Sequence, residues 1–301
     1  MASQVITIGP LQSTRRATPG SIWRAFWKLP VIPTTVLMSV LVIPAVFSEW
    51  LAPYDPLIGN LSRRLTPPFW MEGGSTDYLL GTDKQGRDIL SRLIHGARIS
   101  FSVSMVVVIL TTTFGVALGM IAGFFGGKID RCVMWVVDTF LSTPFILMAL
   151  VIVSVLGPGY GTMLLVASLF SWIGDCRQIR GETLTIKGLD YIQRAHVAGS
   201  PWWRILRHHI LPNVSSTVIV LATLQVGSTI LLESTLSFLG LGIPRPQPSW
   251  GVMVADGRDH ILGAWWLSFL PGLCIMLTVF SVNLLGDWLR DHLDPKLRQS
   301  T

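Results

Sequence analysis

Side chains that could perform acid–base chemistry or bind a metal are few and scattered in this 301-residue sequence. His208 and His209 are adjacent, but neighbouring helical positions point about 100° apart, so one metal ion cannot easily use both. Glu233 lies near the end of a long apolar segment. A carboxylate there is costly if it faces lipid, so we expect Glu233 to face protein or water, as a candidate for lining a substrate path.

The motifs of nucleotide-binding and hydrolytic enzymes are absent from the sequence. A phosphate-binding loop requires G-x-x-x-x-G-K-[ST], but Lys128 is followed by isoleucine and Ala122 stands in place of the first glycine. H-E-x-x-H and G-x-S-x-G do not occur either. The cysteines lie in or beside apolar segments without metal-ligand spacing: Cys132, Cys176 and Cys274. We therefore expect no catalytic residue, no metal, no cofactor and no ATPase activity on this chain.

The composition indicates a polytopic membrane protein. Hydrophobic residues make up 50% of the chain and charged residues 13%, with a mean hydropathy of +0.55. Soluble domains carry about 25% charged residues. The formal net charge of +6 does not require a nucleic-acid partner, because Lys and Arg on cytoplasmic loops produce the same excess. We expect an all-α integral membrane protein that contacts lipid and no nucleic acid.

A membrane-spanning helix needs about 20 mostly apolar residues, and roughly six segments qualify. They are 29–52, Phe101–Phe125, Cys132–Leu156, Thr162–Ile173, Val214–Phe238 and a last segment ending near Leu285. Pro144 should kink the third span. Asp138, in the same span, fits a hydrated interface as well as a substrate path. The fourth span is short unless its helix continues through the basic residues that follow it.

The spans divide the chain into a membrane core and polar flanks. We expect a tail at 1–28, the first helix at 29–52, a loop at 53–98, a five-helix core at 99–289 that includes a loop at 188–212, and a tail at 290–301. In the 53–98 loop, apolar residues between Ile89 and Ile94 share one helical face and polar residues between Arg87 and Arg92 take the other. This pattern predicts a helix lying in the membrane interface.

Glycines recur every fourth residue along the second span. They are Gly115, Gly119, Gly123 and Gly127. Residues four apart share one face of a helix, so the spacing predicts a bare stripe that another helix can approach closely. Within a membrane this pattern favours helix packing over ligand binding.

The polar stretch 190–213 separates two long apolar segments and has the local chemistry of two short helices. Gly199 can take the left-handed conformation that ends a helix. Ser200 and Pro201 then suit an N-cap and a first helical position. An amphipathic turn follows, and we expect Pro212 to end it. The stretch therefore predicts a compact helical knob between two membrane spans.

This knob resembles the cytoplasmic loop of ABC-importer permeases, whose motif is Glu-Ala-Ala, three residues, Gly, nine residues, Ile-x-Leu-Pro. Here the motif positions are held by Gln193, Arg194, Ala195, Gly199, His209, Leu211 and Pro212. Gln193, Arg194 and His209 depart from the pattern, whereas the spacing from Gly199 to Pro212 is intact. In such proteins the knob docks on an ATPase subunit. The resemblance implies that these residues couple the chain to an ATPase: Gln193, Ala195, Gly199, Trp202, Trp203, Ile205, Leu211 and Pro212.

Three further segments are similar to the permeases that import dipeptides, oligopeptides and nickel. Gly81–Ser100 contains Gly-Thr-Asp-x-x-Gly-Arg-Asp-x-Leu-Ser-Arg followed by Gly-Ala-Arg-x-Ser. Leu236–Gly251 contains a glycine-rich turn and a run of prolines ending in Trp-Gly, in which Arg245 departs from the usual Pro. The ending Gly286–Lys296 contains Gly-Asp-x-Leu-Arg-Asp-x-Leu-Asp-Pro. The resemblance extends from about Leu80 to Lys296, most of the chain.

This resemblance implies the type I importer permease fold in the bacterial cytoplasmic (inner) membrane. It also implies a homologous second permease subunit, forming a heterodimer, and two ATPase subunits that hold ATP and Mg. An extracytoplasmic binding protein would deliver the ligand. ATP-driven closure of the ATPases would then move the paired knobs and rock the helix bundles between inward-open and outward-open states.

The distribution of basic residues predicts the orientation of the chain. The tail 1–28, the turn at 128–131, the loop around Gly199 and the C-terminus fall on one side and hold most of the Lys and Arg. The loop 53–98 on the other side balances its basic residues with Asp and Glu. By the positive-inside rule both termini are cytoplasmic.

Two other classes are weaker interpretations. A secondary carrier or channel would predict broken helices in two matching halves or charged relays at mid-membrane, and neither is evident. A membrane-embedded enzyme would need a catalytic constellation. Within the permease family, ligands such as nickel chelates, glutathione or opines remain alternatives to peptides, because the binding protein largely sets specificity.

Overall fold

The computed structural model describes residues 30–293, in which the only bridge between extended segments joins Thr82 and Asp88. The α-helices are α2 (Val31–Leu37), α3 (Ile43–Val46), α4 (Ser48–Leu51), α5 (Ile89–Phe125), α6 (Gly127–Ser142), α7 (Phe145–Leu156), α8 (Tyr160–Lys187), α9 (Asp190–Val197), α10 (Trp202–Ile205), α11 (Leu211–Phe238), α12 (Trp250–Gly257) and α13 (Trp266–Leu293). Single π turns form η1 (Met38–Val42) and η3 (Leu206–Ile210), and 3-10 turns form η2 (Leu61–Arg63) and η4 (Arg258–His260).

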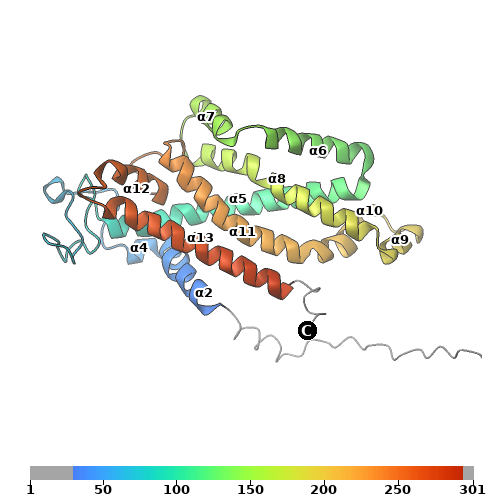
Figure 1. The fold of residues 1–301 in the computed structure, drawn as a ribbon, viewed down its shortest axis with the longest axis horizontal. Helices are drawn as coiled ribbons and strands as arrows, with labels where there is room; N and C mark the ends of the chain where they lie inside the picture. The colour runs from blue at the N-terminus through green and yellow to red at the C-terminus, as the bar shows by residue number, and fades with distance from the viewer. Residues whose placement is uncertain (1–29, 294–301) are drawn as a thin grey trace, which may run out of the picture.

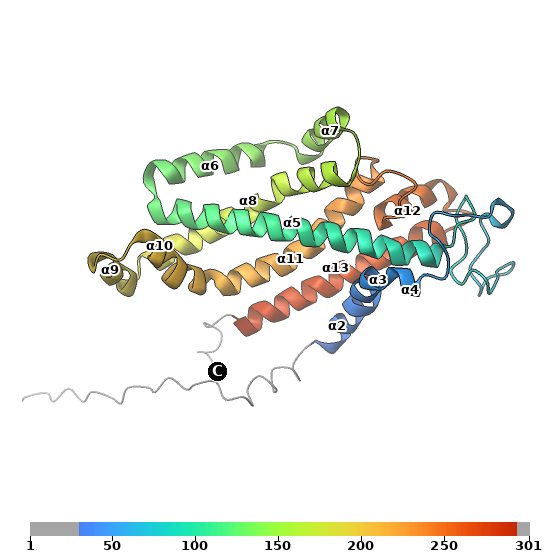
Figure 2. The same ribbon diagram turned by 180° about the vertical axis from the view of Figure 1, so that it is seen from behind.

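The long helices lie lengthwise in an elongated bundle (Figure 1). Helix α5 packs against α8 and α11, and α11 packs against α13. The pair α6 and α7 lies along one edge, whereas α2 lies along the opposite edge (Figures 1 and 2). At one end, which we call the knob end, α9 and α10 project beyond the bundle. At the other, the loop end, α12 and the long loop between α4 and α5 gather.

All six predicted spans are helical, but they differ in length. Between residues 30 and 293, three helices are long and apolar enough to cross a membrane, namely Ile89–Phe125, Trp202–Phe238 and Trp266–Leu293. The third predicted span breaks at Pro144 into α6 and α7, which meet at an angle of 87° and together make a fourth candidate. Helix α8 continues to Lys187, as its charged second half required. The first apolar helix is shorter, at Val31–Val46.

Two prolines, Pro44 and Pro212, each follow a π turn inside a continuous run of helix, although Pro212 was expected to end its helix. Pro44 follows the π turn η1, and Pro212 follows the π turn η3, each by two residues. Proline lacks an N–H and crowds the carbonyl four residues earlier, and in both cases that carbonyl belongs to the π turn. The widened turn accommodates the ring, so the prediction that Pro212 ends the helix is wrong. Residues Trp202–Phe238 run as one helix.

The predicted interfacial helix is instead the first part of α5. Asp88 caps α5 by accepting hydrogen bonds from the Ser91 backbone N–H at 2.8 Å and its hydroxyl at 2.6 Å. The apolar face is buried, but so is the polar face, because Arg92 is only 2% exposed. The preceding loop supplies partners for Arg87, Ser91 and Arg92, so the segment packs inside protein.

The glycine stripe forms the contact between α5 and α8. A methyl group added at Gly115 or Gly119 would lie 2.7 or 2.6 Å from a backbone carbonyl oxygen of α8, and one at Gly123 would lie 2.8 Å from Thr183 Cβ. Gly127 does not belong to this stripe. It begins α6 with a φ of +56° and has open space around it, because α5 ends at Phe125. The packing prediction is therefore confirmed for three glycines and wrong for Gly127.

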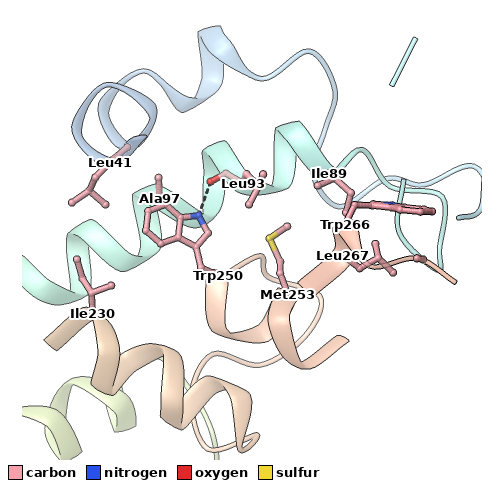
Figure 3. Close-up of a cluster of buried hydrophobic side chains, with 11 residues drawn as sticks. Leu41, Ile89, Leu93, Ala97, Ile230, Trp250, Met253, Trp266 and Leu267 are labelled. Atoms are coloured by element: carbon pink, nitrogen blue, oxygen red, sulfur yellow. Dashed lines mark hydrogen bonds between the residues drawn. The ribbon is translucent and has the colours of Figure 1, made fainter. Parts of the chain in front are cut away.

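The core of the loop end is built around Trp250 on α12, a helix that the sequence patterns did not predict. Trp250 is fully buried, and its Nε1 donates a hydrogen bond to the Leu93 carbonyl at 3.0 Å (Figure 3). Its ring lies against Gly96, where an added methyl would come within 2.8 Å. Leu41, Ile89 and other apolar side chains complete the cluster (Figure 3). The first apolar helix, α5, α11, α12 and α13 are thereby held together.

Candidate functional site

The knob begins with α9, whose end confirms that Gly199 takes the left-handed conformation predicted there. Gly199 has a φ of +78° and donates its N–H to the His196 carbonyl at 3.0 Å. The Ser200 N–H bonds back to the Ala195 carbonyl at 3.1 Å. These two bonds define a Schellman ending, which lets the chain reverse into α10. An added side chain would meet no atom at Gly199, so the backbone conformation alone requires glycine.

The two predicted coupling residues on α9 are placed differently. Gln193 is exposed, and its Nε2 donates to the carbonyl of Lys187 at 3.0 Å. This bond satisfies an end carbonyl of α8, so the amide at the position of the motif glutamate ties the knob to the bundle. Ala195, also on α9, is half-buried.

Two tryptophans form the exposed surface of α10. Trp202 is 52% exposed and Trp203 is 49% exposed. The Trp202 ring lies 5.5 Å from that of Phe125 at the end of α5, and the Arg204 guanidinium lies 5.6 Å from the Trp203 ring. Apolar rings of this size at a helix surface, beside a cation, are typical of a protein-binding surface.

Ile205 faces away from that surface. It is fully buried with Ile192, Ile210 and other apolar residues in one cluster under the knob. The expectation that Ile205 contacts a partner is therefore wrong, because no part of its side chain is accessible. Ile205 instead anchors α10 to the ends of α5 and α8.

The second half of the motif completes the knob from α11. Leu211 is 38% exposed, and Pro212 is also exposed. Asn213 Nδ2 donates to the Tyr191 hydroxyl at 3.1 Å and to the His209 carbonyl at 2.5 Å. The bond to Tyr191 connects α9 directly to the start of α11, whereas the bond to His209 stays within the helical run that contains Asn213.

Glu233, the predicted path residue, lies in a cage of serines. Its carboxylate accepts hydrogen bonds from Ser237 at 2.7 Å, Ser100 at 3.0 Å and Ser234 at 3.5 Å. The side chain has no exposed surface and lines none of the main pockets among the described residues. It meets the expectation of facing protein, and in this conformation it joins α5 to α11.

A second buried polar cluster was not predicted from the sequence. Gln225 donates to the Thr111 hydroxyl at 2.8 Å and to the Ser171 carbonyl at 3.0 Å, and accepts from Thr112 at 3.0 Å. Asp175 is 5% exposed, and its Oδ2 has no hydrogen-bond partner. This cluster joins α5, α8 and α11 at one level. The only signal in the sequence was a glutamine inside an apolar segment.

The predicted charged residues of α6 and α8 pair with each other. Arg177 Nη2 bonds to Asp138, and Arg180 bonds through two nitrogens to Asp130. The Arg177 and Asp138 side chains are 55% and 61% exposed. These pairs fasten the edge helix α6 to α8, and the exposure agrees with a hydrated position for Asp138.

The motif at Gly81–Ser100 forms a buried ion cluster at the loop end. Asp83 accepts from Arg87 Nε at 2.7 Å, and Arg92 Nε lies 3.7 Å from the same carboxylate oxygen. Their side chains are 3–8% exposed. The Arg92 Nη1 also donates to the Pro56 carbonyl at 3.0 Å. The motif therefore folds the long loop onto α5.

Between residues 30 and 293, no group of three or more His, Cys, Asp or Glu side chains could hold a metal ion. The cysteines in this range are free thiols.

The long apolar helices define a polytopic membrane protein. The chain belongs to the family of binding-protein-dependent transport system inner membrane components, which it matches over residues 115–299.

Peptide permeases are among its relatives of known description. It is 42% identical over 265 residues to the di/tripeptide transport system permease protein of Pseudomonas aeruginosa, and the match covers 88% of each chain. It is 43% identical over 264 residues to the dipeptide transport system permease protein of Escherichia coli, again with 88% coverage of each. The glutathione transport system permease protein of Pectobacterium atrosepticum is 37% identical over 281 residues and 92% of each chain.

Among solved structures, the chain resembles inward-facing MetNI methionine ABC transporter structures. The superposition covers 67% of this chain and 96% of that chain, with a TM-score of 0.58 and 15% sequence identity. At this identity the likeness establishes the fold alone. The fold is the type I importer permease fold expected from the sequence.

Proposed function

We propose that this chain is a permease subunit of an ATP-driven importer of short peptides and forms half of its transmembrane pathway. The single observation that carries this proposal is the similarity to peptide permeases, 42–43% identity across 88% of the chain. The helical bundle and the knob supply the two parts that such a subunit needs, a membrane core and a contact for an energy-supplying partner.

The knob is the contact for a separate ATPase subunit. Its exposed surface combines Trp202, Trp203 and Leu211 with exposed arginines, whereas the buried side is held by Ile205 and its neighbours. A surface with accessible apolar rings and a fixed base suits the transmission of movement between rigid bodies. ATP and Mg would be held by the ATPase subunits, since this chain contains no phosphate-binding loop.

The complete importer would contain a homologous second permease subunit, two ATPase subunits and an extracytoplasmic binding protein. In this assembly the knob end and both termini face the cytoplasm of a bacterial inner membrane, and the loop end faces the binding protein. The excess of Lys and Arg on the knob side supports this orientation. Glu233 stays a predicted path residue, to be exposed only if α5 and α11 separate.

The ligand is a second level of the proposal. Short peptides are favoured over glutathione because the di/tripeptide permease of Pseudomonas aeruginosa and the dipeptide permease of Escherichia coli show 42% and 43% identity, against 37% for the glutathione permease. Glutathione is itself a tripeptide, so the chemistry of the pathway would be similar. Nickel-chelate and opine transport remain family alternatives, and a carrier or channel working alone remains the remoter one.

Replacing Gly199 with valine tests the coupling role in the complete importer with its ATPases and binding protein. A β-branched residue is strained at positive φ, so we expect the knob to be displaced and ATP-driven uptake of dialanine to fall roughly five- to thirtyfold. Gly181→Val is the matched control, because Gly181 also has open space around it but lies within α8 without a positive φ. Uptake is measured in proteoliposomes, and displacement of the knob is measured by copurification of the ATPase subunit.

The proposal fails if the Gly199 variant transports as well as the Gly181 variant while both are present in equal amounts. It also fails if the purified chain moves dialanine uphill without any ATPase subunit, which would favour the carrier.

A further inference from the structure

A pocket of about 350 Å³ opens at the loop end, away from the knob. Three segments line it, namely α4 with the loop that follows, the first part of α5, and the proline-rich loop before α12. Small-molecule sites have volumes of roughly 300–1,000 Å³, so the pocket has the size of a small-ligand site.

Hydrogen bonds to buried groups hold two walls of the pocket in place. The loop after α4 is tied to α5, because the Tyr54 N–H donates to Ser91 Oγ at 3.0 Å and Arg92 donates to the Pro56 carbonyl at 3.0 Å. The proline-rich loop ends at Trp250, which bonds to the Leu93 carbonyl of α5 at 3.0 Å. The pocket is thus formed before any ligand arrives, which lowers the cost of binding.

The pocket carries both signs of charge. Arg98 and His95 come from α5, whereas Glu49 and Asp55 come from the opposite wall. Arg98 Nη1 donates to Glu49 Oε1 at 2.8 Å, and these side chains are 55% and 73% exposed. His95 Nδ1 lies 3.0 Å from the Ser91 carbonyl, which fixes the ring against α5. Asp55 uses Oδ1 to accept from the Leu57 N–H at 2.8 Å.

We propose that this pocket binds a zwitterionic short ligand, with its carboxylate on Arg98 and its ammonium group on Glu49 and Asp55. The inference rests on the proposed function, because short peptides carry one charge of each sign at their ends. It goes further by naming the residues of this chain that recognise those ends as the ligand enters the pathway.

The existing ion pair is no obstacle to this exchange. A solvent-exposed pair contributes little to stability, so its replacement by two stronger contacts is favourable. A guanidinium can bind a carboxylate through two parallel hydrogen bonds, whereas Arg98 makes one with Glu49. In the absence of ligand, the pair keeps both charges solvated and oriented toward the pocket.

Binding of dialanine to the complete transporter, without its binding protein, tests the site directly. The transporter is placed in nanodiscs of phosphatidylglycerol, and saturation-transfer NMR reports contact with the peptide. We expect Arg98→Gln and Asp55→Asn each to weaken binding roughly tenfold or more, because each removes a charged partner. Arg258→Gln is the control, since Arg258 is an exposed loop-end arginine, 65% exposed, that does not line the pocket.

Changes in the ligand test the same contacts independently of protein folding. N-acetyl-dialanine amide lacks both charges and should not bind. N-acetyl-dialanine keeps only the carboxylate, and it should bind Glu49→Gln more tightly than wild type, because Arg98 is then free. Equal binding of charged and neutral peptides, or an unchanged affinity in Arg98→Gln and Asp55→Asn, overturns the assignment.

A phospholipid headgroup offers the same pair of charges and is distinguished by the membrane used. If phosphatidylethanolamine in the nanodisc abolishes dialanine binding and occupies the pocket in its place, the site binds lipid and the peptide assignment is wrong. ATP-driven uptake is measured on the same preparations. If ATP-driven uptake is normal and Arg98→Gln binds dialanine as tightly as wild type, only this site is refuted. If uptake by the wild type does not depend on ATP, the proposed function is refuted.

Discussion

The two ends of the bundle use polar residues in opposite ways. At the loop end, Asp83, Arg87 and Arg92 are buried against one another, and Trp250 is fully buried. At the knob end, Trp202 and Trp203 are half-exposed, and the buried contact beneath them is an apolar cluster that includes Ile205. The first arrangement fixes a shape, whereas the second presents a surface. Residue types alone do not distinguish them, because both ends are rich in Arg, Gly, Pro and Trp.

Replacing Trp250 with alanine should give the largest difference between the ends. Removal of a fully buried tryptophan leaves a cavity and should destabilise the protein by about 3–5 kcal/mol. Trp203→Ala is the matched variant, and it should leave thermal stability in detergent nearly unchanged while reducing stimulation of the ATPase. Similar melting temperatures for the two variants would show that the loop end is no more rigid than the knob.

Asp83→Asn should also destabilise the loop end strongly. It leaves the buried guanidinium groups of Arg87 and Arg92 without a counter-charge, and breaking a buried pair typically costs about 3–5 kcal/mol. We place it below Trp250→Ala, because the amide still accepts some of the hydrogen bonds. The control is Asp259→Asn, since the Asp259 side chain is 74% exposed in its pair with Arg258. Urea unfolding that treats the two variants alike would contradict the burial argument.

Gly119→Ala examines the middle of the bundle between the two ends. The new methyl would lie 2.6 Å from the Cys176 carbonyl oxygen, so α5 and α8 must separate, at a cost of about 1–3 kcal/mol. Gly181→Ala, on the open face of α8, should be neutral or stabilising. A melting temperature for Gly119→Ala at or above wild type would show that the glycine stripe is not a tight contact.

The smallest expected effect concerns pH at the loop end. Burial raises the pKa of Asp256, but hydrogen bonds from Arg245 and Lys84 outweigh it and hold that pKa below its ordinary 3.8. A depressed carboxyl pKa contributes stability above pH 3.8 that is lost as the pH falls through the folded-state value. The melting-temperature advantage of wild type over Asp256→Asn should therefore shrink below pH 3.8. A constant difference would exclude this linkage.

The parts of the fold that local chemistry determines were predictable from the sequence. Gly199 followed by Pro201 admits few backbone paths, and the structure shows the expected helix ending there. Pro144 likewise marks the break between α6 and α7, although its 87° angle depends on packing. Apolar segments long enough to span a membrane identified α5, α11 and α13.

What depends on distant partners was not predictable. In the sequence, Arg92 predicts an exposed helix face. Only the structure shows that Asp83 and the Pro56 carbonyl contact it and allow it to be buried. Ile205 lies in a helix of four residues, too short for a period to show which side is buried. Helix α12 follows a run of prolines. Only the close contact between the Trp250 ring and Gly96 of α5 explains why Trp250 is buried.

The π turn at Leu206–Ile210 determines how far a disturbance at the knob can travel. Because the chain passes through it without a break, Trp202–Phe238 is one rod of 37 residues, about 55 Å long. The rod therefore connects Trp202 in the knob to Phe238, next to the serines that enclose Glu233. In the importer proposed above, this rod would carry a movement imposed at the knob along the bundle to the loop end.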